Sequence, residues 1–308
     1  MRIAGEELPV PQLVAPPPDT PLTLSPPVDR EGGTRVYRDV VYANEIGYRP
    51  LRMDLMVPAG AEPAPAVVWM HGGGFLLGSR RRSAFSGPPW DALLARGFAV
   101  AVVEYRFAFE ERFPACVHDA KAAVRWLRRY GADLGLLPHA IGAWGESAGG
   151  YLSAFLALDG RQQALDGEVG VTGPSSEVAA AVDWYGPTDF LDMDAQAEGA
   201  RSIHPHDAPG SPESLLIGGP LQQNPDAARA ASPLSYAASS DPAPLLLMHG
   251  TKDPYVPYQQ SVVLAEAMAA QGAPVTLHLV DGAGHMFEGV DHGPLIQQSV
   301  DFLADHLM

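Results

Sequence analysis

A serine, an aspartate and a histidine stand at positions from which they could cooperate in acyl transfer. Ser147 is the central residue of Gly-Glu-Ser-Ala-Gly at 145–149, between an apolar segment and a helix of small residues. G-x-S-x-G between a strand and a helix is typical of a sharp turn that exposes a nucleophilic serine. The hydroxyl needs a base, and the base needs an orienting acid. Asp253 and His285 each follow a predicted strand, so we expect all three at the carboxyl edge of one sheet.

A glycine-rich segment supplies candidate donors for the oxyanion of a tetrahedral intermediate. His-Gly-Gly-Gly-Phe at 71–75 follows the apolar run 66–70. Consecutive glycines let backbone N–H groups approach a ligand, and each such donor is worth about 2.7 to 4 kcal/mol of barrier. We predict an oxyanion hole made by the amides of Gly73, Gly74 and Ala148.

The two motifs, together with the chain order Ser147, Asp253, His285, resemble the hormone-sensitive-lipase-like branch of the α/β-hydrolase superfamily. The likeness runs from about residue 36 to 306. It implies the same catalytic triad and oxyanion hole, and it implies that His71 organises the oxyanion loop and does not react.

Three features depart from that branch. Glu146 stands where the branch more often has aspartate, and the segments 253–257 (D-P-Y-V-P) and 284–287 (G-H-M-F) are similar to bacterial acetyl-xylan and feruloyl esterase-like proteins and to some peptidase-like relatives. The departures leave the mechanism intact and leave the substrate open. Glu146 either tunes the site through a buried hydrogen bond or makes a structural contact.

Apolar side chains close to the predicted strand ends are candidates for a substrate pocket. Core packing accounts equally well for any one of them, but together they favour an uncharged ester. The predicted substrate-binding residues are Phe75, Leu76, Trp184, Tyr185 and Phe287, with Leu77 beside them.

Several other polar residues invite a functional interpretation. Asp189 follows an earlier strand and is expected to cap a turn, not to compete with Asp253. His204, His206 and Asp207 form H-x-H-D, which could ligate zinc, but on a polar loop we expect ordinary solvent-exposed side chains and no metal. The remaining candidates, His249 and His278, are expected to be hydrogen-bonded core or edge residues.

Short apolar runs alternating with amphipathic helices predict an α/β fold, specifically an α/β-hydrolase fold with a mostly parallel eight-stranded sheet, flanking helices and a partial cap. On the helix around 117–127, the period places Arg125, Arg128 and Arg129 toward water. The predicted strands are 36–42, 52–57, 66–71, 98–104, 140–145, 178–185, 244–249 and 275–280, the first two with the alternation of an antiparallel edge.

The predicted organisation is a proline-rich N-terminal arm at 1–35 and a catalytic domain at 36–308. Within the domain, 191–224 lacks a sustained period and is longer than ordinary connections. It is either a cap over the active site or a surface loop without a function of its own.

The amino-acid composition limits the binding partners and the cellular location that can be expected. A net charge of -16 would repel a phosphate backbone, so nucleic acid is not expected. Cys116 is the single cysteine, which excludes an intrachain disulfide, and it is expected to be buried. No apolar run approaches the roughly 18 residues of a membrane span, and the N-terminus does not resemble a signal peptide, so a cytoplasmic protein is predicted. A homodimer is suggested by analogy with this fold alone.

The leading hypothesis is a serine carboxylesterase that hydrolyses short- to medium-chain carboxylic esters through an acyl-enzyme on Ser147, without cofactor or metal. The partner would be a small-molecule ester. An aminopeptidase-like or amide-cleaving hydrolase is the first alternative, because the same triad serves both bonds. A noncatalytic binding protein of the same fold is the second.

Overall fold

A computed structural model of the 308-residue chain describes residues 2–3, 6–7, 24–45, 47–60, 63–81, 89–160, 164–197 and 205–308. Residues 8–23, which make up much of the predicted arm, lie outside the described residues. Two short strands, β1 (Arg2–Ile3) and β2 (Glu6–Glu7), pair with each other and not with the main sheet.

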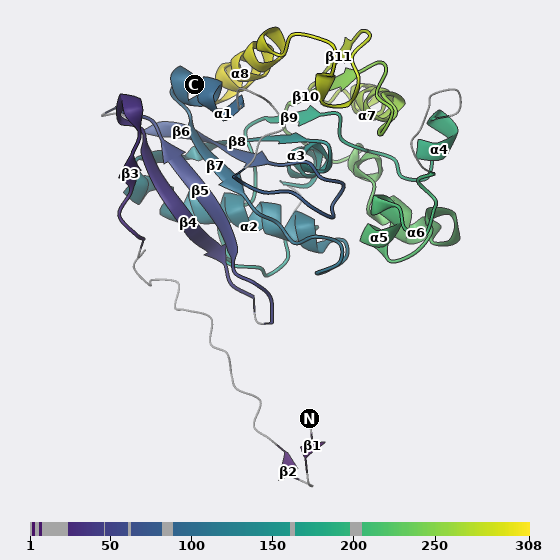
Figure 1. Cartoon of the computed structure of the whole chain (residues 1–308), viewed down its shortest axis with the longest axis horizontal. Helices are drawn as coiled ribbons and strands as arrows, with labels where there is room; N and C mark the ends of the chain where they lie inside the picture. Colours follow the sequence, from purple (N-terminus) through teal and green to yellow (C-terminus); the bar gives the residue numbers. More distant parts are fainter. Residues whose placement is uncertain are drawn as a thin grey trace.

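The main sheet has nine strands in the order β11-β10-β9-β8-β6-β7-β5-β4-β3 (Figure 1). From β7 to β11 neighbouring strands run parallel, whereas β3, β4, β5 and β7 pair antiparallel. The bounds are β3 (Val28–Asp29), β4 (Arg35–Ala43), β5 (Leu51–Val57), β6 (Ala64–Met70), β7 (Ala99–Val103), β8 (Leu136–Glu146), β9 (Ala181–Trp184), β10 (Leu245–Gly250) and β11 (Val275–Val280).

The expected mostly parallel sheet is confirmed, with one correction to its strand number. Each of the eight predicted strands is present, and the ninth, β3, pairs with β4 through only two residues. Two residues are too few to show an alternation of apolar and polar side chains.

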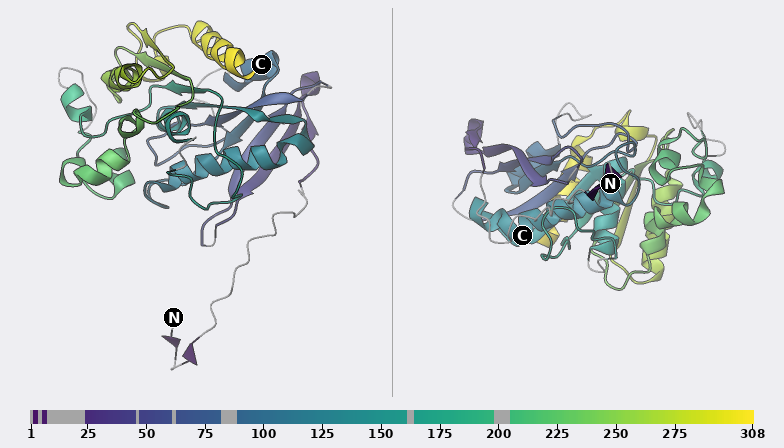
Figure 2. Two further views of the ribbon diagram at one scale, coloured as in Figure 1. Left: turned by 180° about the vertical axis from the view of Figure 1, so that it is seen from behind. Right: turned by 90° about the horizontal axis from the view of Figure 1, so that it is seen from below.

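The helices pack on both faces of the sheet (Figure 2). Along β6, Val68 and Met70 join the core on one face, with α2, α3 and α7, whereas Val67 and Trp69 join the core on the other, with α1 and α8. The α-helices are α1 (Pro89–Arg96), α2 (Ala115–Tyr130), α3 (Ala148–Asp159), α4 (Met193–Gln196), α5 (Pro212–Ile217), α6 (Pro225–Ala230), α7 (Gln259–Ala270) and α8 (Gly293–Leu307). The 3-10 turns are η1 (Glu31–Gly33), η2 (Gly131–Leu134), η3 (Leu221–Gln223), η4 (Pro233–Tyr236) and η5 (His285–Phe287). Among the described residues, no helix combines the length and the apolar character of a membrane span.

The predicted exposure of the α2 arginines is wrong for Arg125 and only partly right for Arg128, which is half-buried and donates to the carbonyls of Pro138, Ser175 and Glu177. Arg125 is only 2% exposed and donates hydrogen bonds to the carbonyls of Asp166, Val169 and Val171. The segment after α3 passes over the outer face of α2 and supplies these acceptors. A helical period alone does not reveal such a covering segment.

Candidate active site

The nucleophile elbow joins β8 to α3 and holds Ser147 with φ 53° and ψ -118°. Such a backbone conformation is strained for a residue with a side chain, and it persists only where the surroundings enforce it. The amide of Ser147 donates to the Trp184 carbonyl at 2.8 Å. A Cβ on Gly145 would lie 2.0 Å from the Gly149 carbonyl oxygen, and one on Gly149 would lie 2.1 Å from that of Met70. Gly145 is therefore required for the strand to approach the first turn of α3, and Gly149 is required for that turn to pack against β6.

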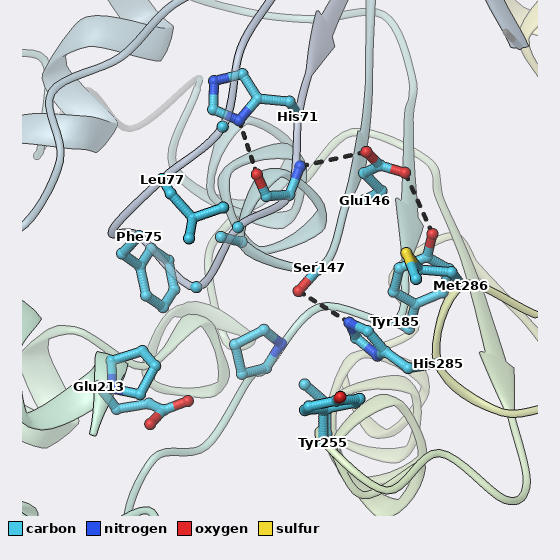
Figure 3. A pocket seen from close by; sticks show the side chains of 18 of the residues that line it. His71, Phe75, Leu77, Glu146, Ser147, Tyr185, Glu213, Tyr255, His285 and Met286 are labelled. Carbon is cyan, nitrogen blue, oxygen red and sulfur yellow. Dashed lines mark hydrogen bonds between the residues drawn. The ribbon is translucent and has the colours of Figure 1, made fainter. Parts of the chain in front are cut away.

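Three side chains from separate loops converge at this turn. His285 Nε2 lies 3.2 Å from Ser147 Oγ, and His285 Nδ1 lies 2.6 Å from Asp253 Oδ2 (Figure 3). Since the carboxylate can only accept, Nδ1 carries the proton and Nε2 is free to accept from the serine hydroxyl. The arrangement suits a nucleophile, a base and an orienting acid.

Asp253 is held as a carboxylate by donors on both oxygens. Oδ1 accepts from the amides of Tyr255 and Val256 at 2.8 and 2.9 Å. Oδ2 faces His285 and also His249 Nε2, the latter at 3.2 Å. Burial works to raise the pKa of Asp253, but the hydrogen bonds from the two histidines outweigh it and hold that pKa well below its ordinary value.

The predicted oxyanion loop follows β6. Gly73 and Gly74 adopt positive φ of 129° and 56°, and a Cβ on Gly73 would lie 1.9 Å from the Leu77 carbonyl oxygen. The Gly73 carbonyl accepts from the amides of Leu76 and Leu77 at 3.1 and 3.2 Å, which closes the loop into a compact turn. The loop borders the same cavity as Ser147 and Ala148.

His71 packs at the base of this loop, and its polar contacts are with Gly72 and Tyr105, away from the three triad candidates. The His71 ring stacks on Tyr105 with ring centroids 4.6 Å apart, and His71 Nδ1 lies 2.8 Å from the Gly72 carbonyl oxygen. The Tyr105 hydroxyl donates to the backbone carbonyl of His71 at 2.8 Å. Burial lowers the pKa of His71. A buried imidazole in this position supports the loop.

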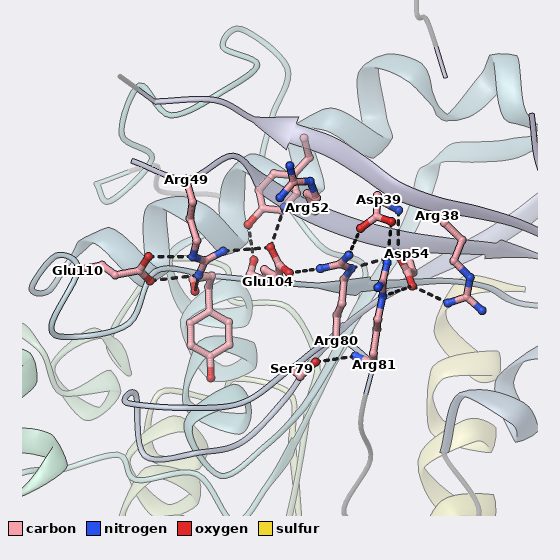
Figure 4. A network of polar contacts seen from close by, with 12 residues as sticks. Arg38, Asp39, Arg49, Arg52, Asp54, Ser79, Arg80, Arg81, Glu104 and Glu110 are labelled. Atoms are coloured by element: carbon pink, nitrogen blue, oxygen red, sulfur yellow. Dashed lines mark hydrogen bonds and ion pairs between the residues drawn. The ribbon is translucent and has the colours of Figure 1, made fainter. Parts of the chain in front are cut away.

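An ion-pair network anchors the far end of the loop (Figure 4). Arg80 is 8% exposed, and its Nε donates to Asp54 at 3.1 Å while its terminal nitrogens pair with Asp39 and Glu104. Arg49 links Glu104 to Glu110 at 3.0 and 2.8 Å. The network ties the loop to β4, β5 and the segment after β7.

Glu146 makes buried hydrogen bonds, which its predicted role in tuning the site requires. Its carboxylate accepts from the Gly72 amide at 3.4 Å and from the Tyr185 hydroxyl at 3.3 Å. Burial raises the pKa of Glu146, and these hydrogen bonds only partly oppose the effect. Glu146 therefore links the turn that holds Ser147 to Gly72 at the start of the glycine-rich loop.

A cavity of about 870 Å³ opens above Ser147. Of the predicted pocket residues, Phe75 and Tyr185 line it, as does Leu77. The prediction is wrong for Leu76, Trp184 and Phe287, which are not among the lining residues. Trp184 and Phe287 are fully buried and pack against each other in the core, with ring centroids 5.1 Å apart, and Leu76 packs against the opposite core.

The cavity is also lined by residues that we did not predict from the sequence. Tyr255 and Met286 adjoin the predicted triad in sequence, and this proximity could have suggested them. His206 and Glu213 come from the predicted cap. The expected solvent exposure of His206 is wrong, because the side chain is 3% exposed. No local sequence pattern indicates this burial, since it depends on how the segment folds over the site.

The other polar candidates make hydrogen bonds or are buried, as expected of residues with a structural role. Asp189 accepts from the Leu191 amide at 3.3 Å, as expected of a turn cap. His278 lies 2.6 Å from Gln298, and Cys116 is buried, which raises its pKa to about 12. His204 lies outside the described residues. Within the described ranges, no group of three or more potential metal-ligating side chains is present.

Comparisons with known proteins agree with this geometry. The BD-FAE family model matches residues 53–268. Esterase LipQ of Mycobacterium tuberculosis is 30% identical over 226 residues, which are 73% of this chain and 51% of LipQ. Esterase LipC of the same organism is 29% identical over 75% of this chain and 55% of LipC. The chain thus spans about half the length of the curated relatives it matches.

Solved structures show the same fold over most of the chain. A truncated carbohydrate esterase from gut microbiota has a TM-score of 0.79 at 28% identity, covering 90% of this chain and 98% of that one. An esterase of Thermogutta terrifontis has a TM-score of 0.64 at 28% identity, covering 89% of this chain and 90% of that one. The resemblance to the α/β-hydrolase superfamily is confirmed, and the chain belongs to the BD-FAE family.

Proposed function

We propose that the protein is a serine carboxylesterase that hydrolyses short- to medium-chain carboxylic esters. The single observation that carries the proposal is the chain of contacts Ser147–His285–Asp253, with separations of 3.2 and 2.6 Å, at the floor of the cavity. Relatives named as esterases support it, as does the Thermogutta terrifontis esterase described as phosphonylated by sarin.

In the proposed reaction, His285 Nε2 takes the proton of Ser147 as Oγ attacks the ester carbonyl. The amides of Gly73, Gly74 and Ala148 stabilise the oxyanion. The protonated His285 then donates to the leaving alcohol, and Asp253 stabilises the imidazolium. Water deacylates the enzyme by the same proton transfers in reverse. Residues 191–224 are proposed to cap the site, since His206 and Glu213 of this segment line the cavity.

Ser147→Ala tests the proposal. Hydrolysis of p-nitrophenyl acetate and butyrate should fall by at least about 10⁴-fold, because no other side chain supplies the nucleophile. Far-UV circular dichroism and the melting temperature should stay close to those of the wild type. Retained activity in a folded Ser147→Ala variant would defeat the proposal. Aminoacyl p-nitroanilides, hydrolysed faster than the esters, would favour the amide-cleaving alternative.

A homodimer and a cytoplasmic location stay predictions. An edge strand or the terminal helix α8 would supply the dimer contact, as in other proteins of this fold. Light scattering after gel filtration measures the oligomeric state, and cell fractionation measures the location.

A further inference from the structure

Two ionisable side chains of the predicted cap border the cavity that contains Ser147. His206 is 3% exposed and Glu213, in the first turn of α5, is 5% exposed. Figure 3 shows Glu213 on the opposite side of the cavity from His285 and Met286. Burying an acid and a base at the cavity wall costs solvation energy, which argues against a purely structural role for the two side chains.

The position of His206 is fixed through its backbone. Its amide donates to Asp194 Oδ1 at 2.7 Å, and its carbonyl accepts from the hydroxyls of Ser211 and Ser214. Ser211 Oγ also caps α5 by accepting from the Ser214 amide at 3.1 Å. The same hydrogen bonds therefore place the imidazole and begin the helix that carries Glu213.

The two side chains form an ion pair with His206 Nδ1 and Glu213 Oε2 separated by 3.4 Å. This separation is long for a hydrogen bond, and Oε2 has no hydrogen-bond partner among the described residues. Burial works to lower the pKa of His206, but the carboxylates of Glu213, Asp194 and Asp253 outweigh it and raise that pKa. The pair thus presents an N–H donor and a carboxylate acceptor side by side at the cavity wall.

Charge decides which ligand suits the pair. An anion would be repelled by the Glu213 carboxylate, and a cation would find no acceptor in the N–H of His206. A hydroxyl group can donate to Glu213 and accept from His206. A cavity of about 870 Å³ has room for more than a short alkyl ester. We propose that His206 and Glu213 form a subsite that binds a hydroxyl group of the ester substrate. The inference rests on the proposed esterase function and deepens it.

Matched ester pairs test the subsite and locate the hydroxyl. Glycerol monoacetate against propyl acetate, and a methyl xyloside monoacetate against cyclohexyl acetate, vary the alcohol. Ethyl 6-hydroxyhexanoate against ethyl hexanoate varies the acyl group. The wild type should favour the hydroxylated member of at least one pair by about 10-fold or more in kcat/KM, which is the effect of a hydrogen bond to a charged group.

Glu213→Leu should bring that ratio to within about twofold of one, because the acceptor is lost. Glu213→Gln keeps the shape, lacks the charge and should reduce the ratio less, which keeps the test usable if the leucine variant folds poorly. Asp226→Asn is the matched control, because Asp226 lies on α6, pairs with Arg229 and has a fully exposed side chain. Its ratio should equal that of the wild type.

Equal rates within every pair for the wild type would overturn the subsite, as would a preference that survives both Glu213 substitutions. A wild type that hydrolyses no member of any pair would instead overturn the esterase proposal, and the subsite would fall with it. The two failures are therefore distinct.

Discussion

At the scale of single residues, Asp253 is surrounded by four donors, and one of them belongs to a histidine outside the triad. His249 is fully buried, with Nδ1 2.7 Å from Ser261 Oγ and Nε2 2.9 Å from the Val256 carbonyl. Because that carbonyl can only accept, Nε2 carries the proton, and the same N–H faces Asp253. His249 is therefore a positioning residue for the carboxylate.

Two substitutions separate this role from packing. The amide nitrogen of His249→Gln can take the place of Nε2, whereas that of His249→Asn takes the place of Nδ1 and does not reach Asp253. Without this donor, the negative charge of Asp253 is less stabilised by hydrogen bonds. The carboxylate then interacts more strongly with the protonated form of His285. The acid limb of the pH profile of kcat/KM should move upward by about 0.4 to 1 pH unit in His249→Asn.

His249→Gln is the control for that measurement, and its acid limb should stay near the wild-type position. A lower melting temperature in both variants with unmoved pH profiles would assign His249 to packing alone.

The sequence predicted the meeting of Ser147, Asp253 and His285 because each lies in the loop or turn that follows a strand of one sheet. It did not predict the surroundings of His206, since Asp194 and Ser211 reach it through folding of a segment without a period. Trp184 and Phe287 show the complementary error. Trp184 ends β9 and Phe287 lies in η5 close to His285, but both side chains pack into the core.

At the scale of elements, the oxyanion loop depends on the two structures that hold its ends. His71 and Tyr105 support the beginning, and Arg80 fixes the end against β4 and β5. Burial works to raise the pKa of Asp54, but hydrogen bonds from the Asp39 amide and Arg80 keep it below its ordinary value. Asp54 is therefore a charged acceptor at neutral pH.

Gly73→Ala tests whether this loop needs its observed backbone. The added Cβ would lie 1.9 Å from the Leu77 carbonyl oxygen, so the loop must shift and misplace its amides. We expect kcat for p-nitrophenyl butyrate to fall about 10²- to 10³-fold, comparable to loss of one oxyanion donor. Gly210→Ala is the control, since a Cβ there meets nothing within 4 Å. Equal kcat values in the two variants would contradict the assignment.

Strands were predictable because their apolar runs are local signals, and the observed bounds of β5, β10 and β11 lie within a residue or so of the predicted ones. The short helices in the predicted cap at 191–224 were not predictable. α4 and α5 have four and six residues, fewer than two full turns, so no period can be read from them.

At the scale of the whole molecule, one buried carboxyl links stability to pH. Asp183 on β9 is fully buried, accepts from the Gly186 amide at 2.8 Å, and lies beneath the helix that carries Ser147. Burial raises its pKa from 3.8 to about 7. Because the folded state holds this proton longer than the unfolded state, the contribution of Asp183 to stability falls as the pH rises from about 4 to 7.

Asp183→Asn removes that dependence and keeps an acceptor for Gly186. The free energy of unfolding of the variant, relative to the wild type, should rise by roughly 2 to 3 kcal/mol between pH 5 and pH 8. Urea denaturation at the two pH values measures the difference. A constant difference would show that Asp183 is ionised in the folded protein throughout this range.

The two-sided core was predictable from the alternation of helices and strands, but the covering of α2 was not. Arg125 lies at a position that the helical period assigns to water, and it is buried by the segment that follows α3, 40 or more residues later in the chain. Sequence separation on this scale leaves no local pattern.

Ser147 is proposed to be the nucleophile of an acyl-transfer site. The most direct test is labelling of the wild type with a fluorophosphonate, followed by peptide mass spectrometry. The geometry predicts one adduct per chain on Ser147, loss of ester hydrolysis in proportion to labelling, and no adduct in Ser147→Ala. Active wild-type enzyme that remains unlabelled, or that carries the adduct on another residue, would contradict the claim.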